Sequence, residues 1–168
     1  MKSSLLLRSW QLTDVPSLVH YANNANIANN LTDGFPHPYT ETNAQQFIQM
    51  AANGNPVTIM AITIDGAAVG GIGLHLQHDV FRNNAELGYW LGEPFWGKGI
   101  VTEAIRQMVH YGFQQLPINR IFARPFGRNI ASQRVLEKVG FVLEARFEKT
   151  LIKNGILEDE LVYAIRKQ

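Results

Sequence analysis

The sequence predicts a mixed α/β domain of the α+β type, with one central, mostly antiparallel sheet and helices on both of its faces. Two observations carry this prediction. Asp65-Gly66 and Lys153-Asn154-Gly155 each separate two apolar runs at the spacing of a β-hairpin. Amphipathic segments separate the other strands, so the expected order of elements is βααβββαβαββ. The chain shows no linker, repeat or low-complexity tract, and we expect residues 1–168 to form a single domain.

The chain opens with a strand and a helix. Ser4–Trp10 has the composition of a strand, and Thr13 is placed to cap a helix that runs through Tyr21. The asparagine-rich stretch 23–30 then weakens helix formation, because asparagine side chains compete for backbone hydrogen bonds.

A loop, a second helix and a hairpin follow. The two prolines of Leu31–Tyr39 exclude a regular helix there, and Thr40 can cap the next one. That helix has an apolar face made of Ala44, Phe47, Ile48 and Ala51. The hairpin strands are Val57–Ile64 and Ala67–Leu76. Glycines inside the second strand indicate a bulge or a close backbone approach, at Gly70, Gly71 and Gly73.

The second half alternates strands and helices before it ends in a hairpin. Asn84–Leu91 is the next strand, and Pro94 interrupts the chain before a helix that opens from Gly97 onward. Its apolar stripe consists of Val101, Ala104, Ile105, Met108, Val109 and Gly112. The remaining expected elements are a strand at Asn119–Ala123, a helix from about Asn129 to Val139 that stops at Gly140, and hairpin strands at Phe141–Leu151 and Ile156–Ile165.

Composition excludes several classes of protein. There are no cysteines, which removes disulfide scaffolds, cysteine zinc sites and thiol chemistry, and His75 and His78 lack a third ligand, so no metal is expected. The net charge of +1 is too small for a nucleic-acid binder. No apolar run reaches the roughly 20 residues that cross a bilayer, and the three-leucine run near the N-terminus is too short for a secretion signal. We therefore expect a cytoplasmic protein.

The segment Trp96–Thr102 (WGKGIVT) stands between a strand and an amphipathic helix. Its glycines, Gly97 and Gly99, leave backbone N–H groups uncovered where the helix begins, and helix N-termini attract anions. Lys98 adds a positive charge, so a phosphate or diphosphate is the favoured ligand. The alternative is that the glycines only shape a turn. The second half of the chain carries twelve Lys/Arg against nine Asp/Glu, a net charge of +3, which also suits a small polyanion.

Several motifs together resemble one family. The string AELGYWLGEPFWGKGIVTEA at 85–104, NIAS at 129–132 and KVGF at 138–141 closely resemble the GCN5-related N-acetyltransferase (GNAT) family. Within that family the chain is similar to the branch of ribosomal-protein N-terminal acetyltransferases (RimJ/RimL-like). The resemblance spans nearly the whole chain and includes Pro38-Tyr39-Thr40 before the second helix. It implies a sheet that splays into a V.

The resemblance implies acetyl-CoA as co-substrate and places its parts. The diphosphate would bind the backbone amides of the loop, and the pantetheine would pair with the main chain of β-strand residues. These cofactor-binding positions are Tyr89, Trp90, Leu91, Trp96, Gly97, Lys98, Gly99, Ile100, Val101, Thr102 and Asn129. Trp96 and Val101 depart from the family's usual Arg/Gln and Gly/Ala, and bulky Val101 would tighten the approach of the diphosphate. Arg134 and Lys138 are candidates for the 3′-phosphate, or else form a solvated helix face.

The resemblance also implies two catalytic residues. Glu86 matches a carboxylate that deprotonates the amine through water; otherwise it orients substrate or pairs with a surface cation. A backbone N–H near Leu91 matches the oxyanion donor. The tyrosine that often donates a proton in the last helix is replaced by Leu136, so Ser132 is the candidate that protonates or hydrogen-bonds the thiolate. Asn129, which opens that helix, is alternatively an ordinary N-cap.

The expected reaction is direct transfer of acetyl to a primary amine, most simply the α-amine of a ribosomal or other protein N-terminus. At pH 7 an α-amine with a pKa of about 8 is neutral about 200-fold more often than a lysine with a pKa of ~10.4. The acceptor groove is expected between the first two helices, with their loop Asn29–Tyr39, and the final hairpin. A polyamine or amino-sugar acetyltransferase and a non-catalytic acyl-CoA sensor remain as alternatives. No nucleic-acid or membrane partner is expected, and the oligomeric state is open, a homodimer included.

Overall fold

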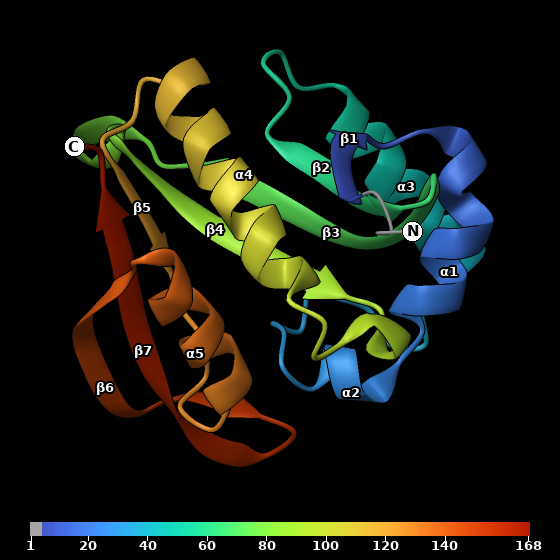
Figure 1. The fold of residues 1–168 in the computed structure, drawn as a ribbon. Coiled ribbons are helices and arrows are strands. Elements are labelled where there is room, and N and C mark those ends of the chain that lie inside the picture. The colour runs from blue at the N-terminus through green and yellow to red at the C-terminus, as the bar shows by residue number, and fades with distance from the viewer. Residues whose placement is uncertain (1–4) are drawn as a thin grey trace.

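One sheet organises the part of the chain that the computed structural model describes, residues 5–168 (Figure 1). Its neighbours are antiparallel except for the parallel pair β4–β5. In spatial order the strands are β1 (Leu5–Ser9), β2 (Ile59–Ile64), β3 (Ala67–Leu76), β4 (Asn84–Leu91), β5 (Arg120–Ala123), β7 (Ile156–Arg166) and β6 (Val142–Lys153). The mostly antiparallel mixed sheet that the sequence predicted is therefore confirmed.

Helices cover both faces of this sheet. They are α1 (Val15–Ala22), α2 (Ala25–Ala28), α3 (Glu41–Ala52), α4 (Ile100–Gln115) and α5 (Ile130–Val139), with short 3₁₀ turns at Leu12–Asp14, Asp79–Phe81 and Glu93–Phe95. In Figure 1, α4 crosses the sheet over β3 and β4, and α5 lies beside it over β5 and β7. Their core includes the fully buried Ile72, Met108 and Leu136. On the other face, α1 and α3 enclose a second core around Leu18 and Ile48. No helix within residues 5–168 is long and apolar enough to cross a membrane.

Turn and cap residues act as their chemistry predicts. Asp65 and Gly66 have φ of 49° and 88°, and Asn154 and Gly155 have φ of 52° and 75°, the left-handed pair that type I′ hairpin turns require. The Thr40 hydroxyl accepts from the Asn43 amide and caps α3. These elements form where local sequence predicts them because their hydrogen bonds close within a few residues.

The N-terminal segment differs from the sequence-based expectation in three details. Residue 4, the expected first residue of β1, lies outside the described residues. Thr13 does not cap α1: it lies in a 3₁₀ turn, and the helix begins only at Val15. The asparagine-rich stretch still forms the short helix α2, because the Asn24 side chain accepts from the Asn26 amide and caps it.

The glycines of β3 permit both a bulge and a close approach. The register between β2 and β3 shifts between Ile62 and Thr63. A Cβ placed on Gly70 would lie 2.5 Å from the Trp90 carbonyl oxygen, and one on Gly71 would lie 2.7 Å from the indole nitrogen of Trp90. Small residues are required here because β4 and the Trp90 side chain pack directly against this part of β3.

The sheet splays at its centre. Parallel pairing of β4 with β5 covers only Asn84 to Glu86, and beyond Glu86 β4 pairs with β3 alone. Figure 1 shows the two strands starting together and diverging into a V, with the N-terminus of α4 at the open end. The divergence leaves one edge of β4 without a strand partner along Leu87–Leu91.

Asp14 and Arg8 form a partly buried ion pair that joins η1, the Leu12–Asp14 turn, to β1. The Asp14 carboxylate accepts from Arg8 at 2.7 and 2.8 Å and from the Gln11 amide at 2.9 Å. Burial raises the pKa of Asp14, but the Arg8 guanidinium and the Gln11 amide outweigh it and hold that pKa below its usual value. The folded state therefore favours the ionised carboxylate.

We expect Asp14→Asn to lower the free energy of unfolding by about 2 kcal/mol at neutral pH, because charged hydrogen bonds are lost. A depressed folded pKa contributes stability above the unfolded pKa of about 3.9, and this contribution disappears as the pH falls through the folded value. Urea unfolding of both proteins should therefore show a difference that shrinks in acid. A difference that stays constant into strong acid would contradict the assignment.

Candidate active site

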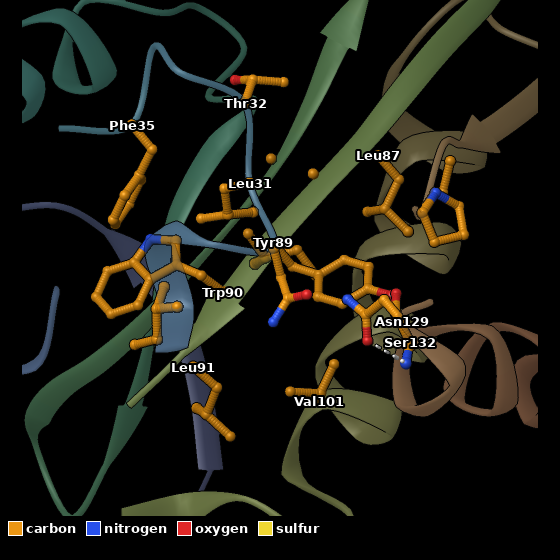
Figure 2. Close-up of a pocket in the computed structure, with 18 of the residues that line it drawn as sticks. Leu31, Thr32, Phe35, Leu87, Tyr89, Trp90, Leu91, Val101, Asn129 and Ser132 are labelled. Atoms are coloured by element: carbon orange, nitrogen blue, oxygen red, sulfur yellow. Dashed lines mark hydrogen bonds between the residues drawn. The ribbon is translucent and has the colours of Figure 1, made fainter. Parts of the chain in front are cut away.

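A cavity of about 1150 Å³ occupies the gap between β4 and the segment that follows β5. β4 runs through it and divides it into two sides. Figure 2 shows Tyr89 and Trp90 on opposite sides of the strand: Tyr89 points toward Ser132 of α5, and Trp90 points toward Phe35 in the loop before α3. The splay of the sheet therefore creates one cavity with two chemically different sides.

The N-terminus of α4 forms one end of the cavity. Gly97 and Gly99 have φ of 72° and 76°, and a Cβ on either would meet nothing within 4 Å, so the loop presents an open backbone surface. The first helical backbone bond runs from the Glu103 amide to the Gly99 carbonyl, which leaves the amides of residues 100–102 without helical acceptors. The 16-residue helix adds its positive end. This surface fits a diphosphate.

Among residues 96–102, Trp96 lines the cavity and Lys98 does not. The Lys98 ammonium donates to the Pro94 carbonyl at 2.8 Å and lies 5.6 Å from the Phe95 ring centroid, and Lys98 does not line the cavity. The Trp96 indole donates to the Leu91 carbonyl at 2.7 Å and thereby ties the loop to the end of β4. Gly97 and Gly99 to Thr102 line the cavity together with Trp96.

The free edge of β4 offers main-chain groups. The Gly92 amide donates to the Val69 carbonyl on β3. Because backbone groups alternate in direction along a strand, the amides of Leu91 and Tyr89 point to the opposite edge, into the V. A free strand edge of this kind can pair with an extended pantetheine arm, and its Leu91 N–H can donate a hydrogen bond to a carbonyl oxygen.

Ser132 and Asn129 open α5 on the same side of the cavity. The Asn129 side chain accepts from the Ser132 amide at 3.2 Å, so Asn129 is the N-cap of this helix while it also lines the cavity. The Ser132 hydroxyl lies 2.5 Å from the Tyr89 hydroxyl. Leu136, one turn farther along, is fully buried in the core and offers no polar atom.

Glu86 pairs with a cation, the alternative that the sequence left open, but sequence reasoning did not identify Arg124 as its partner. Arg124, just after β5, donates to both carboxylate oxygens of Glu86, at 2.8 and 2.9 Å, and lies 3.4 Å from Glu160. Hydrogen bonding to Glu86 is the main reason why the pKa of Arg124 is raised. His75 is the register partner of Glu86 on β3. Arg124 reaches Glu86 because β4 and β5 are parallel neighbours, a pairing with no local signal in the sequence.

The side of the cavity that Trp90 faces is apolar, and hydrogen bonds join two of the chain segments beside it. Phe35 lies 5.9 Å from Trp90 and 5.2 Å from Tyr39, between ring centroids. The loop that carries Phe35 contacts the β6–β7 hairpin, where Lys153 donates to Asp33 at 2.8 Å and Asn154 donates to the Asn29 side chain at 2.9 Å. These are the segments between which the acceptor groove was expected.

Two basic residues of α5 were candidates for a phosphate. Lys138 lines the cavity, whereas Arg134 is not among the lining residues. Val101, the bulky departure from the family pattern, also lines it and packs partly against the core. The structure thus brings Lys138 and the loop amides to the same cavity and leaves Arg134 outside it.

Comparison with known proteins finds relatives that are named acetyltransferases. A family model described as an acetyltransferase (GNAT) domain matches residues 4–142. YdaF of Bacillus subtilis (strain 168), provisionally named a ribosomal N-acetyltransferase, is 38% identical over 104 residues, which are 62% of this chain and 56% of YdaF. The ribosomal-protein-serine acetyltransferase of Escherichia coli (strain K12) is 31% identical over 49% of this chain and 46% of its own length. The chain thus spans about half the length of these curated relatives.

Solved structures match over a larger part of the chain. The microcin C7 self-immunity acetyltransferase MccE, crystallised with acetyl-CoA and AMP, superposes with a TM-score of 0.83 at 25% identity. The match covers 99% of this chain and 94% of that one. The chain and MccE therefore share their overall fold.

Proposed function

This chain belongs to the acetyltransferase (GNAT) family, and we propose that it transfers an acetyl group from acetyl-CoA directly to the α-amine of a protein or peptide N-terminus. The observation that carries this proposal is the divided cavity. One side combines the open amides before α4 with the free edge of β4, and the other side combines Glu86 with an apolar wall. Acetyl-CoA supplies the activated thioester, and MccE is a similar protein that has been crystallised with it.

Different residues of the chain would serve different parts of the acetyl transfer. The loop amides at 97 and 99–102 would bind the diphosphate, and the Leu91 N–H would stabilise the negative charge that develops on the carbonyl oxygen. Ser132 would hydrogen-bond the sulfur that leaves. Glu86 would accept the proton of the amine through water. The contact between Glu86 and Arg124 does not prevent this proton transfer, because each carboxylate oxygen has a second lone pair.

An α-amine fits this site better than a polyamine. Glu86 and Glu160 both contact Arg124, and Asp33 contacts Lys153, so these carboxylates already have cationic partners. The wall beside them is formed by aromatic rings. An α-amine is also easier to deprotonate than a lysine, by about 3 kcal/mol at pH 7. The names of YdaF and of the E. coli relative support a ribosomal protein as the acceptor.

The test is acetylation of a matched set of amines, followed as release of free CoA and as product mass. We expect peptides with a free α-amine to react at least tenfold faster than the same peptides with a blocked N-terminus and one free lysine, in line with the roughly 200-fold excess of neutral amine. Spermidine and an amino sugar serve as comparison acceptors. Faster reaction of either would identify a small-molecule acetyltransferase. Binding of acetyl-CoA without CoA release for any amine would identify a sensor.

A further inference from the structure

Two hydroxyl groups from distant parts of the sequence meet inside the cavity. Tyr89 comes from the middle of β4 and Ser132 from the first turn of α5, and their oxygens are 2.5 Å apart. Both residues line the cavity, on the side that also carries Val101 and the start of α4 (Figure 2). The contact spans the open part of the V, where no strand pairing connects β4 with the elements that follow it.

The Tyr89 hydroxyl is protonated throughout the physiological pH range. Burial raises the pKa of Tyr89 to about 12, although the hydrogen bond to Ser132 acts in the opposite direction. A phenol is a stronger acid than an aliphatic alcohol and is the better donor of the pair. When Tyr89 donates to the Ser132 oxygen, the hydroxyl hydrogen of Ser132 is free to point into the cavity.

Ser132 is also fixed through its backbone. Its amide donates to the Asn129 side chain, which holds the first turn of α5 in place. One turn farther along the helix, position 136 is a leucine that is buried in the core with no exposed surface, so it cannot donate a hydrogen bond in place of Ser132. Asn129 therefore holds Ser132 in position, and Tyr89 sets the direction of the Ser132 hydroxyl.

We propose that Tyr89 is a positioning residue for acetyl transfer, whose hydroxyl orients Ser132 and strengthens the hydrogen bond that Ser132 donates to the departing sulfur. This inference rests on the proposed function. In the step it serves, the N–C bond forms and the C–S bond breaks, and the electron pair of that bond goes to sulfur. The amine loses one proton through water to Glu86, and one proton from water neutralises the thiolate. The two hydroxyls only donate hydrogen bonds and end the cycle unchanged.

The first test needs no acceptor. Hydrogen bonds to a thiolate lower the pKa of the bound CoA thiol below that of the free thiol. Calorimetric titration of the wild-type protein with CoA should therefore show affinity that rises, about tenfold for a pKa lowered by one unit, as the pH passes from below the pKa of the bound thiol to above that of the free thiol. Desulfo-CoA, which lacks the thiol, should show no such rise. In Tyr89→Phe the rise should shrink to about twofold.

Tyr163→Phe is the matched control for these titrations. Tyr163 is also buried, and its hydroxyl donates to Glu137 at 2.9 Å, outside the cavity. This variant loses a buried tyrosine hydroxyl without touching Ser132, and the pH dependence of CoA binding should stay as in the wild type. An equal rise in wild type and Tyr89→Phe, or none in the wild type, would overturn the proposal even if the protein acetylates peptides.

The second test is kinetic and uses the best acceptor from the amine set. We expect Tyr89→Phe to lower kcat about tenfold, roughly the loss of one hydrogen bond, with little change in KM for acetyl-CoA. In the Ser132→Ala background the same change should have almost no effect, because Tyr89 acts through Ser132. Equal reductions in both backgrounds would show that Tyr89 acts independently. If no amine reacts, the function fails, and the CoA titration still decides the role of Tyr89.

Discussion

Gly99→Asp is expected to weaken the binding of acetyl-CoA by at least about 100-fold, because like charges placed together cost several kcal/mol. Gly99 immediately precedes α4, and a side chain there would enter open space next to the amides at 100–102. A carboxylate at this position would occupy the proposed diphosphate site and repel the ligand. Calorimetric titration with acetyl-CoA measures the loss directly.

Two control variants separate charge from backbone strain. Gly155 has a φ of 75°, against 76° for Gly99, and a Cβ on it also meets nothing within 4 Å, but it lies in the β6–β7 turn. Gly155→Asp should therefore share the strain and bind acetyl-CoA normally. Gly99→Asn keeps the shape of the side chain without its charge, and should weaken binding much less than Gly99→Asp. Normal binding by Gly99→Asp would show that the diphosphate binds elsewhere.

Ser132→Ala is expected to reduce kcat by about 100-fold, the usual effect of removing one hydrogen-bond donor from a charge that develops in the transition state. Affinity for acetyl-CoA should change little, because the proposed binding contacts are backbone amides on other elements. The fold should also be preserved: the amide of residue 132, which Asn129 accepts, remains in the alanine variant. Steady-state kinetics, acetyl-CoA titration and thermal unfolding together check these three statements.

The contrary outcome for Ser132 is equally clear. If Ser132→Ala bound acetyl-CoA poorly but turned over normally at saturation, Ser132 would be a binding residue and not a partner of the sulfur. If neither binding nor kcat changed, the contact between Ser132 and Tyr89 would have only a structural role. The Tm of the variant distinguishes these outcomes from simple unfolding.

Local sequence predicted the elements whose bonds close within a few residues. The two type I′ turns, the Thr40 cap of α3 and the Gly140 end of α5 lie where their residue types indicated. The prediction that Thr13 caps α1 was wrong because a tertiary contact overrides the capping propensity of threonine. Arg8 of β1 binds Asp14, and the chain makes one 3₁₀ turn before α1 begins. Helix boundaries are therefore reliable where the cap binds its own helix, and less so where it binds another element.

The same distinction between local and long-range contacts applies to the site. The loop glycines and the helix after them are contiguous in sequence, so an anion site could be inferred from chemistry and family resemblance together. Lys98 lies in the same loop and was predicted to add a positive charge there; in the structure its ammonium donates to the Pro94 carbonyl. Arg124 had no signal at all, because its contact with Glu86 depends on the parallel pairing of β4 with β5.

The sequence by itself determined the mixed sheet, the hairpin turns, the Thr40 cap of α3 and the glycine-containing loop before α4. These follow from backbone preferences and periodicity, which act over short distances along the chain. Only the tertiary structure decided that β4 parts from β5 after Glu86, that Arg124 holds Glu86, and that Tyr89 meets Ser132. Those contacts join residues 38 and 43 positions apart. They arise because strand register and helix packing place the residues together, and neither can be read from the residues themselves.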